Sequence, residues 1–284
     1  MSIKRVGIIG SGIMGSGIAE VAAASGYEVV LRSRSQQGAD AMVAGLAKSL
    51  AKQVEKGKRT ESEAAEITAR VSSTTHLGQL AEVDLVIESV VEDLTVKKEL
   101  FAELDSVCRD GAILATNTST LPVVEMAMAT GRPELVCGIH FFNPAPAMSL
   151  VEVVRPITAS DATVATALEF AAACGKDPVE VKDQAGFIVN ALLFPYLNNA
   201  VRLLEQGVAT KEGIDTAMKG GCGFPMGPFA LLDLVGLDTS LAILDALYDE
   251  FRDPNYAAVP LLRRLVTSGQ LGRKTKSGFY DYNR

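Results

Sequence analysis

Histidine, cysteine and tryptophan are scarce in this sequence of 284 residues, which has two histidines, four cysteines and no tryptophan. Structural zinc sites are built from closely spaced cysteine and histidine pairs, and no Cys-x-x-Cys pair occurs here, so the sequence predicts no metal site. Widely spaced cysteines are typical of reduced, buried thiols rather than of a disulfide framework. The cysteines are Cys108, Cys137, Cys174 and Cys222.

Excess positive charge and a long uninterrupted apolar run are also missing. The formal net charge is -7, and non-specific nucleic-acid binding requires a basic surface, so we expect no nucleic-acid partner. The apolar segment 229–248 is interrupted by Asp233, Asp238 and Asp245, which predicts an amphipathic helix and not a membrane span. The apolar run near the N-terminus is rich in glycine, unlike a secretory signal. We therefore expect a cytoplasmic protein without a membrane partner.

What the first 182 residues do contain is a regular alternation of short β-branched runs with helical patterns. This alternation is typical of βαβ units and predicts a doubly wound α/β sheet. Between Ser35 and Arg70, two helical segments separated around Gly57 predict an inserted helical hairpin. The expected strands are 5–9, 28–31, 84–87, 112–115, 136–139, 151–154 and 179–181.

Strand patterns stop after Asp183, and the remaining sequence predicts an all-α domain. We expect breaks between helices at Gly220-Gly221 and around Pro225 to Pro228. The sequence thus predicts two domains, an α/β domain of residues 1–182 and an all-α domain of residues 183–284. The expected helices are 187–205, 211–218, 228–251 and 260–268.

A glycine-rich turn follows the first predicted strand. Residues 10–15 read GSGIMG, a GxGxxG pattern placed between a strand and an alanine-rich helix. In this setting the pattern is specific for a Rossmann-type dinucleotide site, where the helix N-terminus holds the pyrophosphate. The residues expected at the cofactor are Gly10, Gly12, Ile13, Met14 and Gly15.

The end of the second predicted strand bears on the choice of cofactor. NAD-specific sites place an acid there to hold the ribose hydroxyls, but this chain has Arg32, Ser33 and Arg34. A serine between two arginines can hold a 2′-phosphate through charge-assisted hydrogen bonds. The sequence therefore favours NADP, with NAD as the alternative if the arginines point into solvent.

Only two imidazoles are available as an acid/base. His76 lies in a polar stretch and is expected at the surface, whereas His140 ends a predicted strand. Glu152 lies in the next strand, LVEVV, an apolar setting that makes an acid conspicuous. If the two strands are neighbours, Glu152 can orient and stabilise the protonated imidazole of His140. A buried histidine and an unrelated buried acid would be the alternative.

Taken together, these motifs resemble the 3-hydroxyacyl-CoA dehydrogenase family, and within it the short bacterial 3-hydroxybutyryl-CoA dehydrogenases. The resemblance extends along essentially the whole chain. It rests on GSGIMG at 10–15, DLVIESVVED at 84–93, ATNTST at 115–120, GIHFFNPAP at 138–146, LVEVV at 150–154, GFIVNALL at 186–193, FPMGP at 224–228, GLDT at 236–239 and SGFYDY at 277–282.

The resemblance implies roles for individual residues. His140 is similar to the family's general base and Glu152 to its partner carboxylate, while Ser119 and Asn190 resemble groups that bind the reacting oxygen. The resemblance also implies the (S)-3-hydroxy isomer as substrate and a homodimer formed through the helical domain. Positions that resemble cofactor contacts are Glu92, Lys97, Asn117 and Asn143.

Coenzyme A contacts are implied on the helical hairpin, where Ser49 and Lys56 match the family's pattern. Lys52 shares their helix face by its spacing, so the residues alone also predict a small basic patch suited to phosphates. The alternative is an ordinary solvated helix face.

Other functions remain open at this point. A related dehydrogenase could act on a carrier-protein-bound acyl group or a free sugar acid, and a catalytically silent dinucleotide-binding protein could use the same scaffold. The chain also departs from the family pattern at Ala191, where an arginine is frequent, and at Phe224, where a histidine is frequent. Both departures lie in the second domain, so they affect the prediction of dimer packing and of acyl-chain fit more than that of the reaction.

Overall fold

The computed structural model describes residues 3–283. The chain forms two compact units, one ending at Asp183 and the other beginning at Gln184, and each has a hydrophobic core of its own. Asp183 accepts hydrogen bonds from the backbone amides of Val123 and Val124, which begin a short helix of the first unit. Burial raises the pKa of the Asp183 carboxyl, and these two amide hydrogen bonds oppose that rise.

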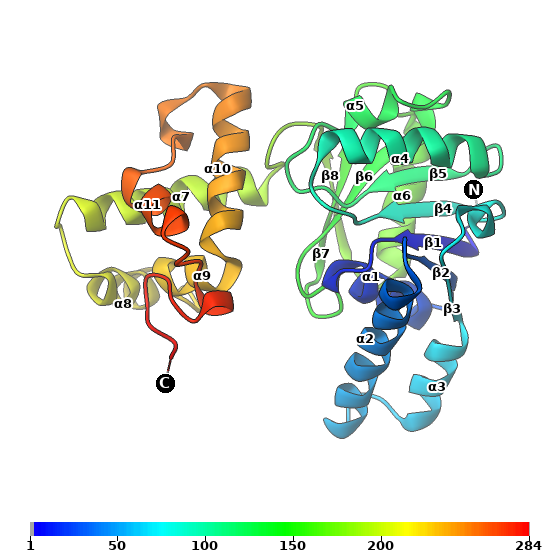
Figure 1. Ribbon diagram of the computed structural model, residues 1–284, viewed down its shortest axis with the longest axis horizontal. Coiled ribbons are helices and arrows are strands. Elements are labelled where there is room, and N and C mark those ends of the chain that lie inside the picture. The colour runs from blue at the N-terminus through cyan, green and yellow to red at the C-terminus, as the bar shows by residue number, and fades with distance from the viewer. Residues whose placement is uncertain (1–2, 284) are drawn as a thin grey trace. The chain divides into compact units, whose positions relative to one another are not determined.

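The first unit is built on an eight-stranded sheet with the order β3-β2-β1-β4-β5-β6-β7-β8 and helices on its faces (Figure 1). All neighbouring strands are parallel except β6 and β7, which are antiparallel. The predicted doubly wound, Rossmann-type sheet is therefore confirmed. The strands are β1 (Arg5–Ile9), β2 (Glu28–Arg32), β3 (Val71–Thr74), β4 (Leu85–Glu88), β5 (Ile113–Thr116), β6 (Val136–Phe141), β7 (Leu150–Arg155) and β8 (Asp177–Lys182).

Six α-helices accompany this sheet, together with 3₁₀ turns at Leu77–Leu80 and Pro133–Leu135. They are α1 (Ile13–Ala24), α2 (Gln36–Glu55), α3 (Glu61–Ala69), α4 (Leu94–Val107), α5 (Val123–Ala127) and α6 (Asp161–Ala173). The helices α2 and α3 form the predicted hairpin, with Gly57 between them at φ +65°. Ser35 caps the start of α2, and Thr60 forms a capping box with Glu63 at the start of α3.

Side-chain alternation along the strands separates the two faces of the sheet. Apolar residues such as Ile87, Ala115, Ile139 and Val153 belong to one core cluster with residues of α1 and α6. Neighbouring residues of a strand point to opposite faces, so the polar residues adjacent to these must point away from that cluster. Those polar residues are Glu88, Thr116, His140 and Glu152, all of them buried.

One strand was not expected. β3 (Val71–Thr74) pairs with β2 at the edge of the sheet, although its sequence VSST has little apolar character. An edge strand is covered on fewer sides than a central one, so it needs no continuous apolar run to be stable. His76 follows this strand and is exposed, as predicted.

The second unit is all-helical, as predicted. Its helices are α7 (Val189–Glu205), α8 (Lys211–Cys222), α9 (Pro228–Val235), α10 (Leu237–Phe251) and α11 (Pro260–Thr267), with 3₁₀ turns at Pro254–Tyr256 and Arg273–Thr275. Two details of the prediction were wrong. The segment 228–251 is two helices, because Gly236 adopts φ +103° and ends α9. The helix α8 continues through Gly220 and Gly221 and ends at the left-handed Gly223.

Among residues 3–283, no helix combines the length and the apolar character that crossing a bilayer requires.

Candidate active site

The turn after β1 is shaped by glycines. Gly10 adopts φ +127°, and a Cβ atom there would lie 2.1 Å from the carbonyl oxygen of Ser89. A Cβ atom on Gly15 would lie equally close, 2.1 Å, to the carbonyl oxygen of Gly10. Either contact is far inside van der Waals distance, so any side chain at these two positions would push β1, α1 and the turn after β4 apart.

Gly12 has the opposite surroundings. It caps the N-terminus of α1 without a side-chain hydrogen bond, and apart from the adjoining residues no described atom lies within 4 Å of where its Cβ would be. The first amides of a helix lack intrahelical acceptors and carry the positive end of the helix dipole. Open space above such amides fits a pyrophosphate, so the residues of this turn suit a dinucleotide.

A groove runs from this turn to the ends of β2 and β4. Arg32, Ser33 and Arg34 all line it, as do Glu99 and Glu103 of α4. The structure thus brings the predicted cofactor-selecting residues beside the glycine turn, and it adds two acids that the sequence reasoning missed. Those acids lie one helical turn apart on α4, an element far from β2 in the sequence.

The guanidinium of Arg32 is only partly satisfied by its surroundings. Its Nε atom is buried and makes no hydrogen bond within the part of the chain that the structure describes. Burial lowers the pKa of Arg32, the negative charge of Glu103 opposes that shift, and the positive charge of Arg34 adds to it. A half-buried cation beside a second cation gains energy when an anion binds. Ser33 is itself buried, and Gly38 packs against its hydroxyl.

His140 and Glu152 meet across β6 and β7, where the antiparallel register places them directly opposite each other. The Nδ1 atom of His140 lies 2.8 Å from Oε2 of Glu152, and the two residues are 4 % and 1 % exposed. An ionised carboxylate can only accept a hydrogen bond, so Nδ1 carries the hydrogen. The Nε2 atom of a neutral His140 is then the lone-pair nitrogen, available to accept a proton.

Ser119 completes this array from the loop after β5. Its Oγ lies 3.1 Å from Nε2 of His140, and with a neutral imidazole protonated on Nδ1 the serine hydroxyl is the donor of this hydrogen bond. The three side chains come from β7, β6 and the loop after β5, and they lie at the end of the sheet where the parallel strands have their carboxyl ends. Ligands of open α/β sheets bind at that edge. Chemically, a base at Nε2 with a hydroxyl beside it can exchange a proton with a substrate oxygen while Glu152 balances the charge.

The other positions that resemble cofactor contacts are distributed around this array. Glu92 accepts a hydrogen bond from the amide of Ser119, at 2.9 Å. Asn117 accepts one at 2.7 Å from the amide of Phe141, which ties the β5 loop to β6. Asn143 is exposed in the loop after β6.

Lys97 is buried and paired with two acids. Its side chain is 1 % exposed, and its ammonium group lies 2.6 Å from Oε1 of Glu88 and 3.3 Å from Oε2 of Glu92. The sequence reasoning missed Glu88. The signal for it was present in DLVIE, where an acid ends an otherwise apolar strand, as Glu152 interrupts LVEVV.

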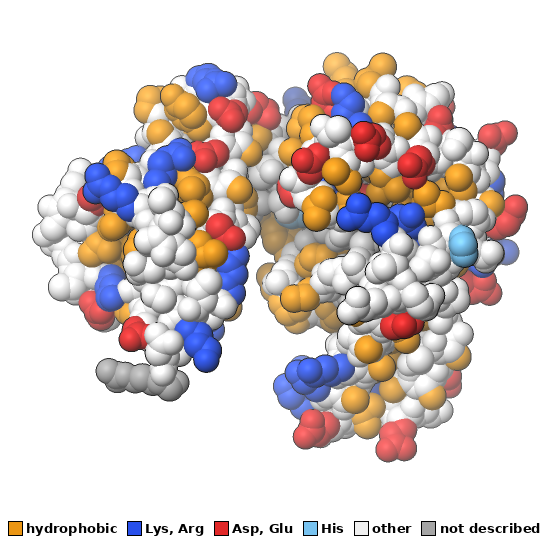
Figure 2. Space-filling model, in the orientation of Figure 1, with side chains coloured by type: hydrophobic (Ala, Val, Ile, Leu, Met, Phe, Trp, Pro, Cys, Tyr) orange, Lys and Arg blue, Asp and Glu red, His pale blue; other side chains and the backbone are white. Residues whose placement is uncertain are grey.

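The predicted coenzyme A residues Ser49, Lys52 and Lys56 line one groove along α2. The loop 144–147 and the face of α1 that carries Gly17 form its other walls, and Lys48 and Lys58 add two further cations. Figure 2 shows a cluster of basic side chains near the lower end of α2. Such a groove concentrates positive charge where an extended polyphosphate could lie.

The groove also contains a buried acid, Glu20 of α1, which is 2 % exposed. It accepts a 2.6 Å hydrogen bond from Gln53, whose own side-chain oxygen accepts one from Arg59. These contacts fix the side chain of Gln53 and connect α2 to α1 through Glu20.

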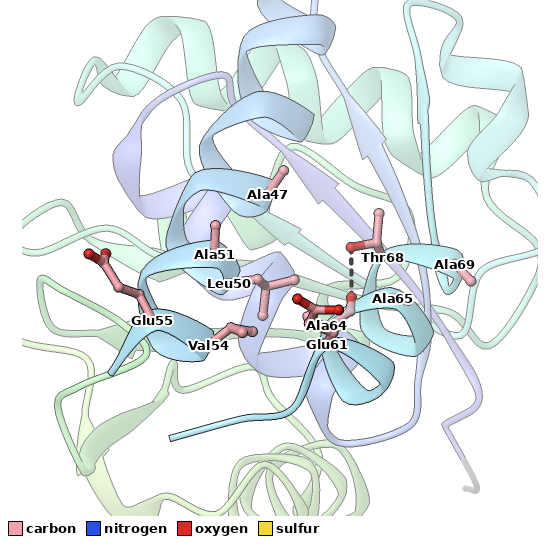
Figure 3. Close-up of a pocket in the computed structure, with 10 residues that line it drawn as sticks. All are labelled: Ala47, Leu50, Ala51, Val54, Glu55, Glu61, Ala64, Ala65, Thr68 and Ala69. Carbon is pink, nitrogen blue, oxygen red and sulfur yellow. Dashed lines mark hydrogen bonds between the residues drawn. The ribbon is translucent and has the colours of Figure 1, made fainter. Parts of the chain in front are cut away.

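Another hollow lies on the opposite side of α2, between it and α3 (Figure 3). Small apolar side chains such as Ala47, Ala51 and Ala64 make most of its lining, and Thr68 donates a hydrogen bond to the carbonyl of Ala64. No residue that the sequence predicted as functional lines it. The hairpin therefore carries its lysines on one face of α2 and an apolar groove on the other.

Asn190 belongs to the second unit, where it is buried in the first turn of α7. Within residues 3–283, no group of three or more histidine, cysteine or carboxylate side chains is arranged to hold a metal ion.

The fold and the glycine turn define a Rossmann-type nucleotide-binding domain joined to a helical domain. Comparison with known families makes this more specific. Residues 5–184 match the family model described as "3-hydroxyacyl-CoA dehydrogenase, NAD binding domain", and residues 186–282 match the one described as "3-hydroxyacyl-CoA dehydrogenase, C-terminal domain". The chain belongs to the 3-hydroxyacyl-CoA dehydrogenase family.

Individual relatives agree over the full length. The chain is 50% identical over 280 residues to a 3-hydroxybutyryl-CoA dehydrogenase of Clostridioides difficile, covering 99% of this chain and 100% of that one. It superposes on FadB2 of Mycobacterium tuberculosis with a TM-score of 0.97 and 48% identity, covering 99% and 100% of the two chains. A crystal structure of (S)-3-hydroxybutyryl-CoA dehydrogenase from Ralstonia eutropha gives a TM-score of 0.97 at 41% identity, with both chains fully covered.

Proposed function

We propose that this chain interconverts short (S)-3-hydroxyacyl-CoA and 3-oxoacyl-CoA thioesters, using a nicotinamide dinucleotide. The observation that carries the proposal is the Ser119–His140–Glu152 array, in a unit that also contains the glycine turn and in a family whose members are named for this reaction. The specific substrate pair, 3-hydroxybutyryl-CoA and acetoacetyl-CoA, follows from the names of the relatives.

In the oxidative direction, the Nε2 atom of His140 takes the proton of the C3 hydroxyl. The imidazolium that results is stabilised by Glu152, whose carboxylate lies on Nδ1. A nicotinamide dinucleotide held at the glycine turn would supply the two-electron chemistry, as the acceptor of the hydride from C3. Loss of the proton and the hydride leaves a C3 carbonyl, and the reverse reaction returns both to it.

Ser119 holds the substrate oxygen during this exchange. Its Oγ lies 3.1 Å from Nε2 of His140, so a substrate hydroxyl within hydrogen-bond distance of both atoms can donate to Nε2 while the hydroxyl hydrogen of Ser119 turns from the imidazole to the substrate oxygen. Asn190 is proposed as the second donor to this oxygen, by its match to the family pattern. The second unit would supply it, and is also proposed to carry the dimer contact of a homodimer, with exposed apolar side chains such as Leu192 on α7.

For the coenzyme A portion, the groove along α2 is the proposed site. The groove is lined by Ser49, Lys52 and Lys56 together with Lys48 and Lys58. Although the protein as a whole is acidic, this groove therefore offers cations to the phosphates of coenzyme A. Attraction of this kind acts at the surface and raises both affinity and association rate.

For the cofactor, we propose NADP in preference to NAD. Arg32 has a buried Nε without a described partner, and Arg34 lies beside it in the same groove. A 2′-phosphate would satisfy both guanidinium groups, and one such contact is worth about 1.5–3 kcal/mol, or about 10-fold or more in preference. Glu99 and Glu103 act against this preference because they face the same groove. The matching family model is named for NAD binding, and the preference for NADP is expected from Arg32 and Arg34 of this chain.

The test is the absorbance of the reduced nicotinamide, followed with acetoacetyl-CoA and with NADPH or NADH in turn. We expect turnover with both cofactors and a higher kcat/KM with NADPH. Turnover of an acyl-carrier-protein substrate or a free sugar acid, without turnover of acetoacetyl-CoA, would identify a related dehydrogenase instead. Cofactor binding without turnover of any of these would identify a catalytically silent binding protein. Equal or better turnover with NADH would reject the NADP preference alone.

A further inference from the structure

A buried ion pair lies behind the contact between Ser119 and His140. The amide of Ser119 donates to Oε1 of Glu92, and Oε2 of Glu92 lies 3.3 Å from the ammonium group of Lys97. Lys97 in turn lies 2.6 Å from Glu88, whose side chain is 0 % exposed. The backbone of Ser119 is thus bonded to Glu92, which pairs with Lys97 and through it is connected to Glu88.

Two threonine hydroxyls connect these acids to the loop after β5. Thr116 donates to Oε2 of Glu88 at 2.8 Å and accepts from the amide of Thr118 at 3.1 Å. Thr118 donates to Oε1 of Glu92 and accepts from the amide of Leu121 at 3.0 Å. Each hydroxyl therefore has its hydrogen directed at a carboxylate, which leaves its lone pairs directed at backbone amides. The carboxylates determine which way these hydroxyls point, and the hydroxyls hold the loop.

Lys97 is the link between the two acids. Glu88 and Glu92 are both drawn to one ammonium group, and their mutual repulsion is offset only while that group lies between them. Glu88 also accepts from the amide of Val90, at the start of the segment that carries Glu92. A buried carboxylate whose cation is removed must move or take up a proton, and a protonated carboxyl accepts hydrogen bonds less well. The geometry of the loop thus depends on the pair remaining intact.

We propose that Glu88 and Lys97 are positioning residues, which set the place of Ser119 against Nε2 of His140 through Glu92, Thr116 and Thr118. The proposal rests on the proposed function for its effect on rate, but its structural part can be read from His140 alone. Hydrogen-bonded groups in an active site lose about 100-fold in rate for a displacement of about 1 Å, so a small shift of the loop should be measurable.

The experiment uses Thr116→Val and Glu88→Gln in the full chain. Thr116→Val removes the hydroxyl between Glu88 and the loop while keeping the shape of the side chain, and Glu88→Gln removes the charge opposite Lys97. We expect each to lower kcat by about 10-fold and to leave KM for acetoacetyl-CoA within about 2-fold, because the loop orients the reacting groups and not the coenzyme A.

Nitrogen-15 NMR of the histidine rings supplies a readout that does not depend on turnover. The chain has two histidines, and His76 is exposed, so His140 gives the only buried imidazole signal among the described residues. We expect the Nε2 resonance of His140 to move in Thr116→Val and Glu88→Gln, because Ser119 no longer donates to it in the same geometry. The His76 signals should stay in place and serve as an internal reference.

Matched controls separate positioning from general damage. Thr166→Val removes another buried threonine hydroxyl, one that bonds to the carbonyl of Ala162 within α6. Lys98→Met removes the charge of the neighbouring residue of α4, which pairs with Glu125 at the surface. Neither control should change kcat or the His140 resonance, and melting temperatures of all four variants should be measured so that kcat refers to folded enzyme.

The outcomes are distinct. An unchanged kcat and an unchanged His140 resonance in folded Thr116→Val would overturn the proposal, and so would an equal effect in the Thr166→Val control. If the wild-type chain fails to reduce acetoacetyl-CoA, the proposed function fails, and the His140 resonance alone still decides whether Glu88 and Lys97 position Ser119.

Discussion

Both units of this protein bury carboxylates, and the partners of Glu88 and Glu152 in the first differ in kind from those of Asp215 and Asp233 in the second. In the first unit, Glu152 faces the imidazole of His140 and Glu88 faces the ammonium group of Lys97. In the second unit, the partners of the two buried aspartates Asp215 and Asp233 are backbone amides and tyrosine hydroxyls. Buried carboxylates thus occur in two arrangements, one paired with histidine or lysine and the other bonded to amides and tyrosine hydroxyls.

The aspartates of the second unit hold chain segments together. Asp233 accepts from the amides of Phe279 and Tyr280, both at 2.8 Å, and from the hydroxyl of Tyr282 at 3.1 Å. Asp215 accepts from the amide of Phe229 at 2.8 Å and from the hydroxyl of Tyr280 at 3.0 Å. Burial raises the pKa of Tyr280, and the hydrogen bond to Asp215 raises it further.

Neither an amide nor a tyrosine with a raised pKa exchanges a proton near neutral pH, so this cluster is suited to stability and not to acid–base chemistry. A histidine changes its charge close to neutrality. A buried acid by itself is thus no sign of an active site, and the chemistry of its partner decides the role. The predictions below test that distinction, beginning with the largest expected effect.

The largest effect is expected from His140→Gln, which should lower kcat by about 100-fold or more, since a general acid–base group contributes about that much. Glu152→Gln should lower kcat by about 10-fold, because the imidazolium loses its charged partner. His76→Gln changes the exposed histidine and should leave the rate alone. Steady-state kinetics with acetoacetyl-CoA measures all three. A folded His140→Gln enzyme with a near-normal rate would place the acid/base elsewhere.

In the second unit, Asp233→Asn should act on stability instead. The amide side chain keeps one acceptor oxygen but puts an NH₂ group against amide and hydroxyl donors, and hydrogen bonds to a charged group are worth about 1.5–3 kcal/mol each. We expect a loss of about 2–3 kcal/mol in the free energy of unfolding. Urea unfolding measures it, with kcat per folded molecule little changed.

The control for that experiment is Asp238→Asn, which changes a partly exposed aspartate paired with Lys274. Surface pairs contribute about 0–1 kcal/mol, so this variant should stay close to the wild type. Equal losses in the two variants would show that burial of Asp233 adds nothing, and the contrast between the units would then fail on its structural side.

The architecture was largely readable from the sequence, because alternating strand and helix patterns are strong local signals. What was missed were features set by tertiary context. The strand β3 is polar and depends on its neighbour β2 for its hydrogen bonds. Glycine within a helix costs only about 1 kcal/mol, so Gly220 and Gly221 did not interrupt α8, whereas Gly236 ends α9 because it adopts a positive φ.

In the site, the sequence indicated residues but not their contacts. Pairing of His140 with Glu152 depends on the antiparallel register of β6 and β7, which the spacing of the two residues leaves undetermined. The pairing of Glu88 with Lys97 depends on where α4 crosses the sheet, so no short motif contains it. The roles of the predicted cofactor and coenzyme A residues stay predictions.

The cofactor groove of the first unit offers a third kind of charged partner, since the half-buried Arg32 and the exposed Arg34 both line it. Ser33→Asp should shift the NADPH-to-NADH ratio of kcat/KM toward NADH by about 10-fold, because a carboxylate repels the 2′-phosphate and accepts from ribose hydroxyls. Ser33 packs against Gly38, so the aspartate must turn toward the groove to fit. Arg34→Ala is the companion variant and should lower kcat/KM for NADPH only. A ratio that neither variant changes would show that these residues do not contact the cofactor.

The smallest effect is expected where charges are exposed, on the face of α2 that carries the lysines. Replacing Lys52 and Lys56 with alanine should raise KM for acetoacetyl-CoA by about 5-fold at low salt, since exposed ion pairs contribute about 0.2–1 kcal/mol each. The penalty should shrink as salt is added, because exposed charges are screened over about 10 Å at 0.1 M. The Glu152→Gln defect should not respond to salt in this way, because its partner is buried. Lys98→Ala, on α4, is the matched control and should leave KM unchanged. An unchanged KM at low ionic strength in the double variant would move the coenzyme A site away from α2.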